Sequence, residues 1–304
     1  MKYPGMDWQE QMISLYLFVC KHYRQTLCYY CQRMSNYADL SFSDEEVITV
    51  FMFGIIHGFR TLKTIHWFAK NHLGPWFPRL PCYVGFDQRL NQVGEVFCPL
   101  IEIICQEFPE IPRESAQALM DAMPIVMAQR ERRFSAKVAP EIATSNGYCA
   151  TKKMHYYGVK LHIAALRQDQ ALPVPQYIGL THAGMADRKA YEQAMPEMAD
   201  CADQWFADKA YQIQAKPIHR EFDIVLNTPV KKEKGQKSLD AADTLLSKDI
   251  STIRQPIESL FNWINEKTGI QLASKVRSYK GLMVHVFGRL AAALFHLNCS
   301  KFSS

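Results

Sequence analysis

The sequence predicts an α/β protein in which a mixed β-sheet with flanking helices follows an all-α N-terminal region. Residues 8–105 carry apolar side chains at helical spacing and lack the alternation that strands show. A polar stretch with two prolines, PEIPRES at 109–115, then interrupts the pattern. Beyond it, alternating or short apolar runs take turns with helical patterns, as in a sheet covered by helices. We therefore expect domains at 1–108 and 116–304.

The N-terminal domain is predicted to consist of helices. Ser43 is followed by three acidic residues, which is a helix start signal. Residues 83–92 are a candidate reading helix of a helix-turn-helix, with Arg89 exposed to DNA. A plain helical bundle without nucleic-acid contacts explains the same pattern. The helices are expected at Trp8–Met34, Ser43–Ile56, Thr61–Asn71, Tyr83–Val93 and Gly94–Phe108.

The second domain begins with an apolar run at 116–127 that is typical of a buried strand. The stretch from 129 to 151 is expected to form loops, and 231–248 a mobile lysine-rich loop. Further strands are predicted at 153–166, 175–181, 204–207 and 223–227, the first two as a hairpin, and helices at 187–198, 211–220, 253–267 and 280–297.

The predicted helix Ile253–Lys267 has one apolar stripe and one polar side. Ser251 or Thr252 can cap its start, and Pro256 then falls in the first turn, where proline is tolerated. Glu258 would lie near the helix N-terminus, where the dipole favours its ionised form. An amphipathic surface helix with a solvated glutamate is the simpler interpretation of this stretch alone.

Three carboxylates have contexts that suggest a shared site. Asp121 lies inside a predicted buried strand, Asp208 follows a later strand, and Glu258 lies on a late helix. Sites in open α/β sheets form at the carboxyl ends of strands. If the two strands are neighbours, Asp121 and Asp208 meet there and a helix can add Glu258. Three clustered carboxylates require cations, and hard divalent ions prefer such oxygen ligands.

Composition sets broad limits. The chain has 304 residues, a net charge of +5 and nine cysteines without a disulfide framework. The charge is compatible with a nucleic-acid partner, and the cysteines suggest a reducing cytoplasm. The N-terminal sequence does not resemble a signal peptide, and the apolar runs at 12–20 and 47–59 are too short or too broken to span a bilayer.

Four ordered motifs carry a resemblance to a known family: MDAMPI at 120–125, YYGVKLH at 156–162, FADKAY at 206–211 and IRQPIESLF at 253–261. They resemble the DDE transposases of bacterial insertion sequences, most closely the insertion sequence 982 family. The N-terminal segments 41–59 and 80–92 are similar to that family's helical region. The resemblance covers roughly residues 40 to 298.

The resemblance implies a ribonuclease-H-like catalytic domain that cuts element ends and joins them to target DNA. Asp121, Asp208 and Glu258 would be the catalytic, metal-binding triad, with Mg²⁺ as cofactor and Mn²⁺ as a substitute. Double-stranded DNA would be the partner of a homo-oligomer, expected to be a dimer on DNA. The setting would be the bacterial cytoplasm at the nucleoid, with no membrane partner.

Several residues are candidates for DNA contacts. Arg254 matches a signature arginine of the related insertion sequence 4 group, whereas Lys267 is displaced by two positions from the signature lysine. Arg254 could instead form only an intrahelical ion pair with Glu258. Asp187 is expected to cap a helix. The DNA-binding candidates are Arg254, Lys267, Lys209, Tyr211, Lys160, His162 and Arg89.

Two alternatives to the transposase remain open. A ribonuclease-H-like nuclease would cleave DNA without joining it. An inactive DNA-binding remnant would bind DNA through its N-terminal helices without cleavage.

Overall fold

The structure is a computed structural model that describes residues 7–31, 40–150, 152–214, 220–232, 234–236 and 238–301. The chain divides into two compact units, Met1–Phe108 with Ile264–Ser304, and Pro109–Trp263. The second unit begins at the first residue of the predicted linker. Residues 264–304, which the sequence analysis assigned to the second domain, group with the N-terminal helices in this division. The prediction of N-terminal helices followed by a mixed sheet with flanking helices is confirmed.

The first unit is helical throughout its described residues. The expected helix at 8–34 ends at Gln25 and is followed by a short 3-10 turn, while 32–34 lie outside the described residues. The elements are α1 (Trp8–Gln25), η1 (Leu27–Cys31), α2 (Asp44–Ile56), α3 (Leu62–His72), α4 (Tyr83–Gln92), η2 (Gly94–Val96) and α5 (Phe97–Gln106), followed near the C-terminus by α10 (Tyr279–Met283), a π-helical turn η6 (Val284–Gly288) and α11 (Arg289–Lys301).

Helix α2 forms the core of this unit. Its N-terminus has the predicted capping box, in which Ser43 accepts from the Glu46 N–H and Glu46 accepts from the Ser43 N–H. Ten of its thirteen residues are buried, so the helix is enclosed on nearly all sides. Helix α11 packs against both α2 and α5. At Gly288 an added Cβ would lie 2.7 Å from the Phe51 ring, so this packing requires glycine.

The C-terminal helical segment is apolar enough to resemble a membrane span. By length and composition Tyr279–Cys299 could cross a bilayer, but 72% of its most apolar window is buried inside the structure. A buried core helix can have the same length and apolar composition as a membrane span, and the burial of this segment matches a core helix.

The second unit contains the sheet. Its strands are β1 (Gln117–Gln129), β2 (Asn146–Cys149), β3 (Met154–Gln168), β4 (Ala171–His182), β5 (Gln204–Phe206) and β6 (Val225–Asn227). Other described elements are η3 (Arg113–Ser115), α6 (Arg132–Ser135), α7 (Asp187–Met198), η4 (Ala199–Cys201), η5 (Lys209–Gln214) and α9 (Ala241–Thr268). The predicted helix 211–220 appears as a 3-10 helix up to Gln214, and 215–219 lie outside the described residues.

The sheet is mixed, with β1 at the junction between its two parts. β1 pairs with β3 in antiparallel fashion and with β5 in parallel fashion, and β5 pairs in parallel with β6. β3 and β4 form the predicted hairpin. The expectation of loops between 129 and 151 was wrong for Asn146–Cys149, which pairs with β3 as β2. This strand is four residues long, too short for a periodic signal.

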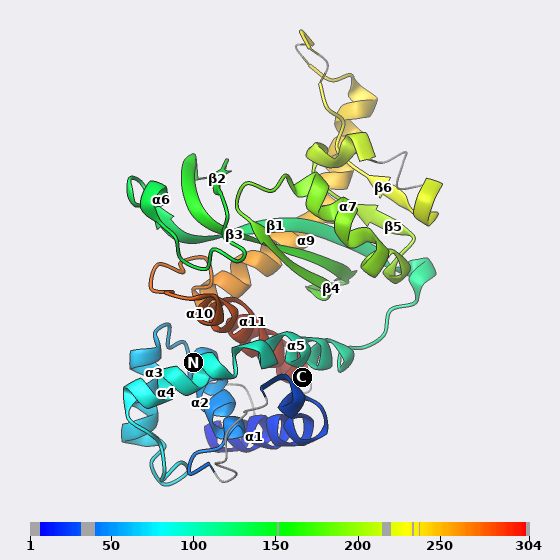
Figure 1. Cartoon of the computed structure of the whole chain (residues 1–304). Helices are drawn as coiled ribbons and strands as arrows, with labels where there is room; N and C mark the ends of the chain where they lie inside the picture. The colour runs from blue at the N-terminus through cyan, green and yellow to red at the C-terminus, as the bar shows by residue number, and fades with distance from the viewer. Residues whose placement is uncertain are drawn as a thin grey trace. The chain divides into compact units, whose positions relative to one another are not determined.

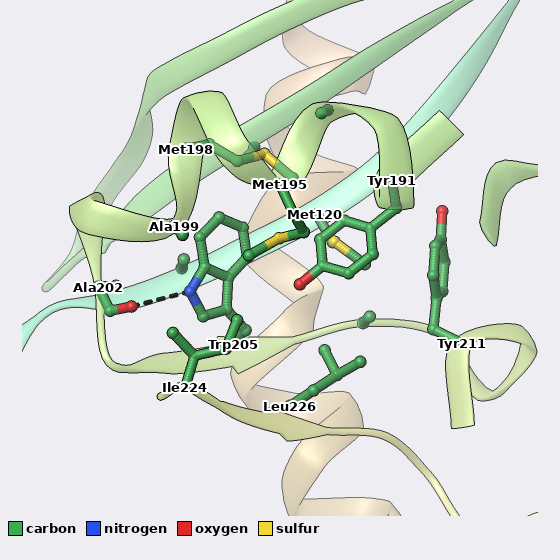
Figure 2. Packing of buried hydrophobic residues seen from close by; sticks show 14 of the residues in the cluster. Met120, Tyr191, Met195, Met198, Ala199, Ala202, Trp205, Tyr211, Ile224 and Leu226 are labelled. Atoms are coloured by element: carbon green, nitrogen blue, oxygen red, sulfur yellow. Dashed lines mark hydrogen bonds between the residues drawn. The ribbon is translucent and has the colours of Figure 1, made fainter. Parts of the chain in front are cut away.

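Helices α7 and α9 cover opposite faces of the sheet (Figure 1). Under α7, Trp205 is fully buried and its indole N–H donates to the Ala202 carbonyl, 2.8 Å away. Met120, Tyr191 and Met195 belong to the same cluster (Figure 2). This core fixes β1 and β5 side by side beneath α7.

The prediction for the start of α9 was wrong. The helix begins at Ala241, within the expected loop, and Pro256 lies in its interior. Ser251 and Thr252 do not cap it, since their hydroxyls donate to the carbonyls one turn earlier. Glu258 therefore lies far from the N-terminus, and the dipole does not account for its ionisation. The polar composition of 241–252 hid a helix whose outer side is solvated.

Two arginines hold the C-terminal end of α9 within the helical unit. The last carbonyls of a helix lack intrahelical partners. Arg60 donates to the Glu266 carbonyl at 2.7 Å, and the buried Arg289 donates to the Thr268 carbonyl. Arg289 also donates to the Arg60 carbonyl at 2.7 Å. Cationic donors are suited to this end of a helix.

His285 lies near Arg289 and is expected to make the stability of the protein depend on pH. Its Nε2 lies 2.9 Å from the Ile270 carbonyl. Burial, and secondarily the Arg289 charge, lower its pKa from 6.5 to about 3. Above pH 6.5 the ring is neutral in both states, so it adds no pH dependence. Below that value the unfolded chain binds a proton that the folded chain rejects, so stability falls.

We expect the full chain to lose about 2 kcal/mol through His285 between pH 7 and pH 5. His285→Gln retains a donor for Ile270 and cannot titrate. Between pH 7 and pH 5 its free energy of unfolding should therefore fall by about 2 kcal/mol less than that of the wild type. Urea unfolding of both proteins at the two pH values measures the difference. Equal pH dependence in the two proteins would contradict this role for His285.

Candidate active site

Asp121 is a carboxylate in the central strand of the sheet. Ala118 and Met120 pack in the core beneath α7, so the alternation of β1 directs Asp121 to the opposite face. Burial raises the pKa of Asp121, while the Arg254 guanidinium and the Ala122 N–H act in the opposite direction. The Oδ1 atom accepts from the Ala122 N–H at 2.8 Å and Oδ2 accepts from Arg254 at 3.0 Å.

Helix α9 supplies the partners of this carboxylate. Arg254 and Glu258 are one turn apart, whereas Ile257 and Leu260 are fully buried. Arg254 Nη1 binds Asp121, and its Nη2 binds Glu258 Oε1 at 2.5 Å. One guanidinium thus links two acids 137 positions apart in sequence. The side-chain exposure is 29% for Asp121, 14% for Arg254 and 52% for Glu258, so the group extends from the interior to the surface.

Asp208 follows the neighbouring strand at a matching position. The parallel pairing of β1 and β5 ends at Leu119 opposite Phe206, and Asp121 and Asp208 each come two residues later. The adjacency of the two strands was only a condition of the predicted site, and the pairing of β1 with β5 meets it. The Asp208 Oδ1 accepts from the Lys209 N–H at 2.7 Å. Burial raises the pKa of Tyr211, with the charges of Asp187, Asp121 and Asp208 adding to the effect.

Tyr211 is therefore a buried neighbour of the acids. Its ring packs edge-on against Tyr191 at a centroid distance of 5.7 Å. A cavity of about 20 Å³ lies beside it, lined by Asp121, His162 and Asp187 among others. Such a space holds about one water molecule. A large substrate must therefore approach the carboxylates from the exposed side, where Glu258 lies.

The donor atoms of the three acids are suited to Mg²⁺, because this ion prefers carboxylate oxygens and completes its shell with water or phosphate. In the described part of the chain, no three His, Cys, Asp or Glu side chains converge closely enough to hold a metal ion. Arg254 instead supplies the positive charge between Asp121 and Glu258. The residues fit the chemistry of a divalent cation that would take over this role.

Lys160 and His162 lie on the other face of the sheet, the face that α7 covers. Lys160 Nζ is 2.7 Å from Asp187 Oδ1 and 2.8 Å from the Met185 carbonyl. His162 Nε2 is 2.8 Å from Thr181 Oγ1, and burial lowers its pKa to about 4. Both side chains are thus engaged within the protein. The expected N-cap role of Asp187 was wrong, since Ala186 occupies that position without a side-chain bond.

The remaining candidates occupy varied positions. Arg89 donates to Asp44 Oδ1 at 2.8 Å and to the Phe42 carbonyl, and its side chain is only 16% exposed. Its predicted exposure on α4 was therefore wrong, because it tethers α4 to the start of α2. Lys267 lies in the last turn of α9, in the helical unit. Lys209 is exposed at the start of η5.

Comparison with known proteins adds no assignment. No protein-family profile matches the chain. No curated protein matches its sequence.

We expect Arg254→Ala to lower the free energy of unfolding by about 2 kcal/mol, because it leaves a partly buried carboxylate without its cation. Asp121→Asn in that background should restore part of the loss. Arg188→Ala is the matched control, since its ion pair with Glu192 on α7 is longer, 4.0 Å, and more exposed. Its expected loss is below about 0.5 kcal/mol. Equal losses in urea unfolding for the two alanine variants would refute the importance of the Arg254 contacts.

Proposed function

We propose that the chain is a DDE transposase of an insertion sequence, with a ribonuclease-H-like catalytic domain. The observation that carries this proposal is the contact of Arg254 with both Asp121 and Glu258. Two of the three acids named by the resemblance lie in one group. The third follows the strand next to the first. Motifs that are far apart in sequence are thus associated with one region of the sheet.

The sheet supports the proposal independently of the motifs. The neighbouring strands β1 and β5 are parallel, so their chains reach Asp121 and Asp208 in the same direction. The central location of β1 fixes one carboxylate, and α9 adds a second from outside the sheet. Metal-assisted phosphodiester chemistry uses several carboxylates beside an open surface, and these elements supply the candidates.

In the proposed mechanism, Asp121, Asp208 and Glu258 hold Mg²⁺, or Mn²⁺ in its place. The bound ions would supply activation of the attacking oxygen and stabilisation of the leaving oxygen. Arg254 changes partner, releasing the carboxylates and donating to a phosphate oxygen of DNA. Tyr211 and its neighbours exclude water from the buried side of the acids. The exposed Glu258 faces the side from which DNA arrives.

The substrates would be the DNA ends of the element and a target duplex. Pairing of two ends requires at least a dimer on DNA. The chain would act in the bacterial cytoplasm on nucleoid DNA. Among the candidate contacts, Arg254 and Lys209 are the better placed near the acids, while Lys160, His162 and Arg89 are engaged in internal contacts.

We expect the wild-type protein, with its native flanking DNA on a plasmid, to cleave the element ends in Mg²⁺ and join them to a second plasmid. Asp208→Asn should reduce both products by at least about 100-fold, because a metal-binding carboxylate is lost. Asp249→Asn, an exposed acid on α9, is the control and should retain activity. Gel analysis of cleaved and joined products measures both steps.

The outcomes of that assay separate the alternatives. Cleavage without joining would favour a ribonuclease-H-like nuclease. DNA binding without cleavage, for wild type and variant alike, would favour an inactive remnant. Retained joining by Asp208→Asn would reject its place in the site.

Direct metal binding has a readout apart from activity. At a Mg²⁺ concentration about ten times the dissociation constant, the wild type should gain about 1.4 kcal/mol of stability. Asp121→Asn should lose this gain, whereas Asp249→Asn should keep it. Thermal unfolding with Mg²⁺ or EDTA, compared within each protein, measures the effect. An equal Mg²⁺ response from Asp121→Asn would place the metal elsewhere.

A further inference from the structure

The excess positive charge of the chain is concentrated at one end of the sheet. Residues 130–153 contain six basic and two acidic side chains, a net charge of +4, against +5 for the whole chain. The basic residues are Arg130, Arg132, Arg133, Lys137, Lys152 and Lys153. We call this set the basic end. Charge gathered in this way attracts polyanions more strongly than the modest net charge of the chain suggests.

The strand register explains how two separate turns form this end. Gln129 of β1 and Gly147 of β2 lie on either side of Tyr156 of β3. Arg130 and α6 follow β1, and the β2–β3 turn contains Lys152 and Lys153. Both turns therefore extend beyond the same end of the sheet, where α6 contacts β1 and β3.

The cations at this end face solvent. Arg130, Arg132, Lys137 and Lys153 are exposed, and none has a carboxylate within 4.0 Å among the described residues. This contrasts with Lys160, Arg89 and Arg254, each bound to an internal acid. The charges of the four exposed residues are therefore available to an external anion.

Exposed aromatic rings accompany the charges. Phe134 is 73% exposed and Tyr148 is 53% exposed. The Arg133 guanidinium lies over the Phe134 ring, 4.3 Å from its centroid, which leaves the other face of the ring open. Interleaved basic and aromatic side chains suit the phosphates together with the sugars or bases of a nucleic acid.

The two turns share a left-handed backbone conformation. Arg130 has φ 52° and Lys153 has φ 46°, a left-handed conformation that glycine adopts with less strain. Both turns thus hold a long cationic side chain where glycine would fit the backbone better. Ala139, Gln170 and Asp223 share this conformation, so the φ angles locate the two turns and the indication of an anion comes from the exposed charges and rings.

We propose that the basic end of the sheet binds the phosphate backbone of DNA, as a surface separate from the acidic site. The proposal rests on the proposed function, which makes DNA the polyanion. Arg130, Arg132 and Lys153 would contact phosphates, and Phe134 would pack against a sugar or base. Contacts of this kind bind DNA without reading its sequence.

The test uses a fluorescently labelled, blunt, random-sequence duplex of about 40 base pairs, with EDTA present, so that binding is measured without catalysis. Affinity is measured by anisotropy between about 50 and 200 mM salt for wild type, Arg130→Gly, Lys153→Gly and the double variant. Each glycine should weaken binding and reduce the slope of log K against log salt by about 1, and both together by about 2. Melting temperatures should stay equal or rise, because strain is relieved.

Two controls separate the effect of removing charge from the effect of relieving backbone strain. Gln170→Gly relieves a left-handed residue, φ 54°, without removing charge, and should bind like wild type. Lys189→Ala removes an exposed cation on α7 and should change the slope less than either glycine. A double variant with wild-type affinity and salt slope would overturn the proposal, as would absence of DNA binding by the wild type. Reduced binding here together with absent metal-dependent cleavage would leave this surface supported while rejecting the transposase.

Discussion

The burial of one carboxylate in the middle of a sheet is the constraint around which the second unit is organised. Asp121 loses most of its hydration in β1, and a charge in that position requires a partner. Its own strand supplies one backbone donor, the Ala122 N–H. The partner comes instead from α9, through Arg254. Docking of this helix on the sheet is thus linked to the ionisation of a single side chain.

The same interaction balances the charge of two of the three acids. Arg254 neutralises Asp121 and Glu258 together, and its planar guanidinium has enough donors for both. Asp208 accepts a backbone N–H and is half-buried, as Asp121 is. The positive charge that balances the acidic site therefore comes from the protein itself. It can move only as far as the Arg254 side chain can.

Sequence patterns were sufficient for much of this architecture. The capping residues before α2, the alternation in β3 and the apolar run of β1 have local physical causes, so the elements could be predicted. The contexts of Asp121 and Asp208 placed both in or after strands but did not by themselves show that these strands are neighbours. The start of α9 failed because a solvated helix of polar residues has little hydrophobic periodicity. The contact between Arg254 and Asp121 depends on tertiary placement, although a buried strand Asp was itself a signal that a cation must exist. The ion pairs of Arg89 with Asp44 and of Lys160 with Asp187 were missed, because exposure was inferred from residue type alone.

Pro256 in the interior of α9 has a consequence for how this helix can move. Proline has no N–H, so the Thr252 carbonyl one turn earlier lacks its intrahelical donor. This missing bond spans the turn from Thr252 to Pro256, which carries Arg254, the residue that binds the buried Asp121. Bending at this level breaks fewer backbone hydrogen bonds than bending in an uninterrupted helix. A small flexure of α9 at this turn can therefore shift the arginine relative to the sheet without unfolding the helix.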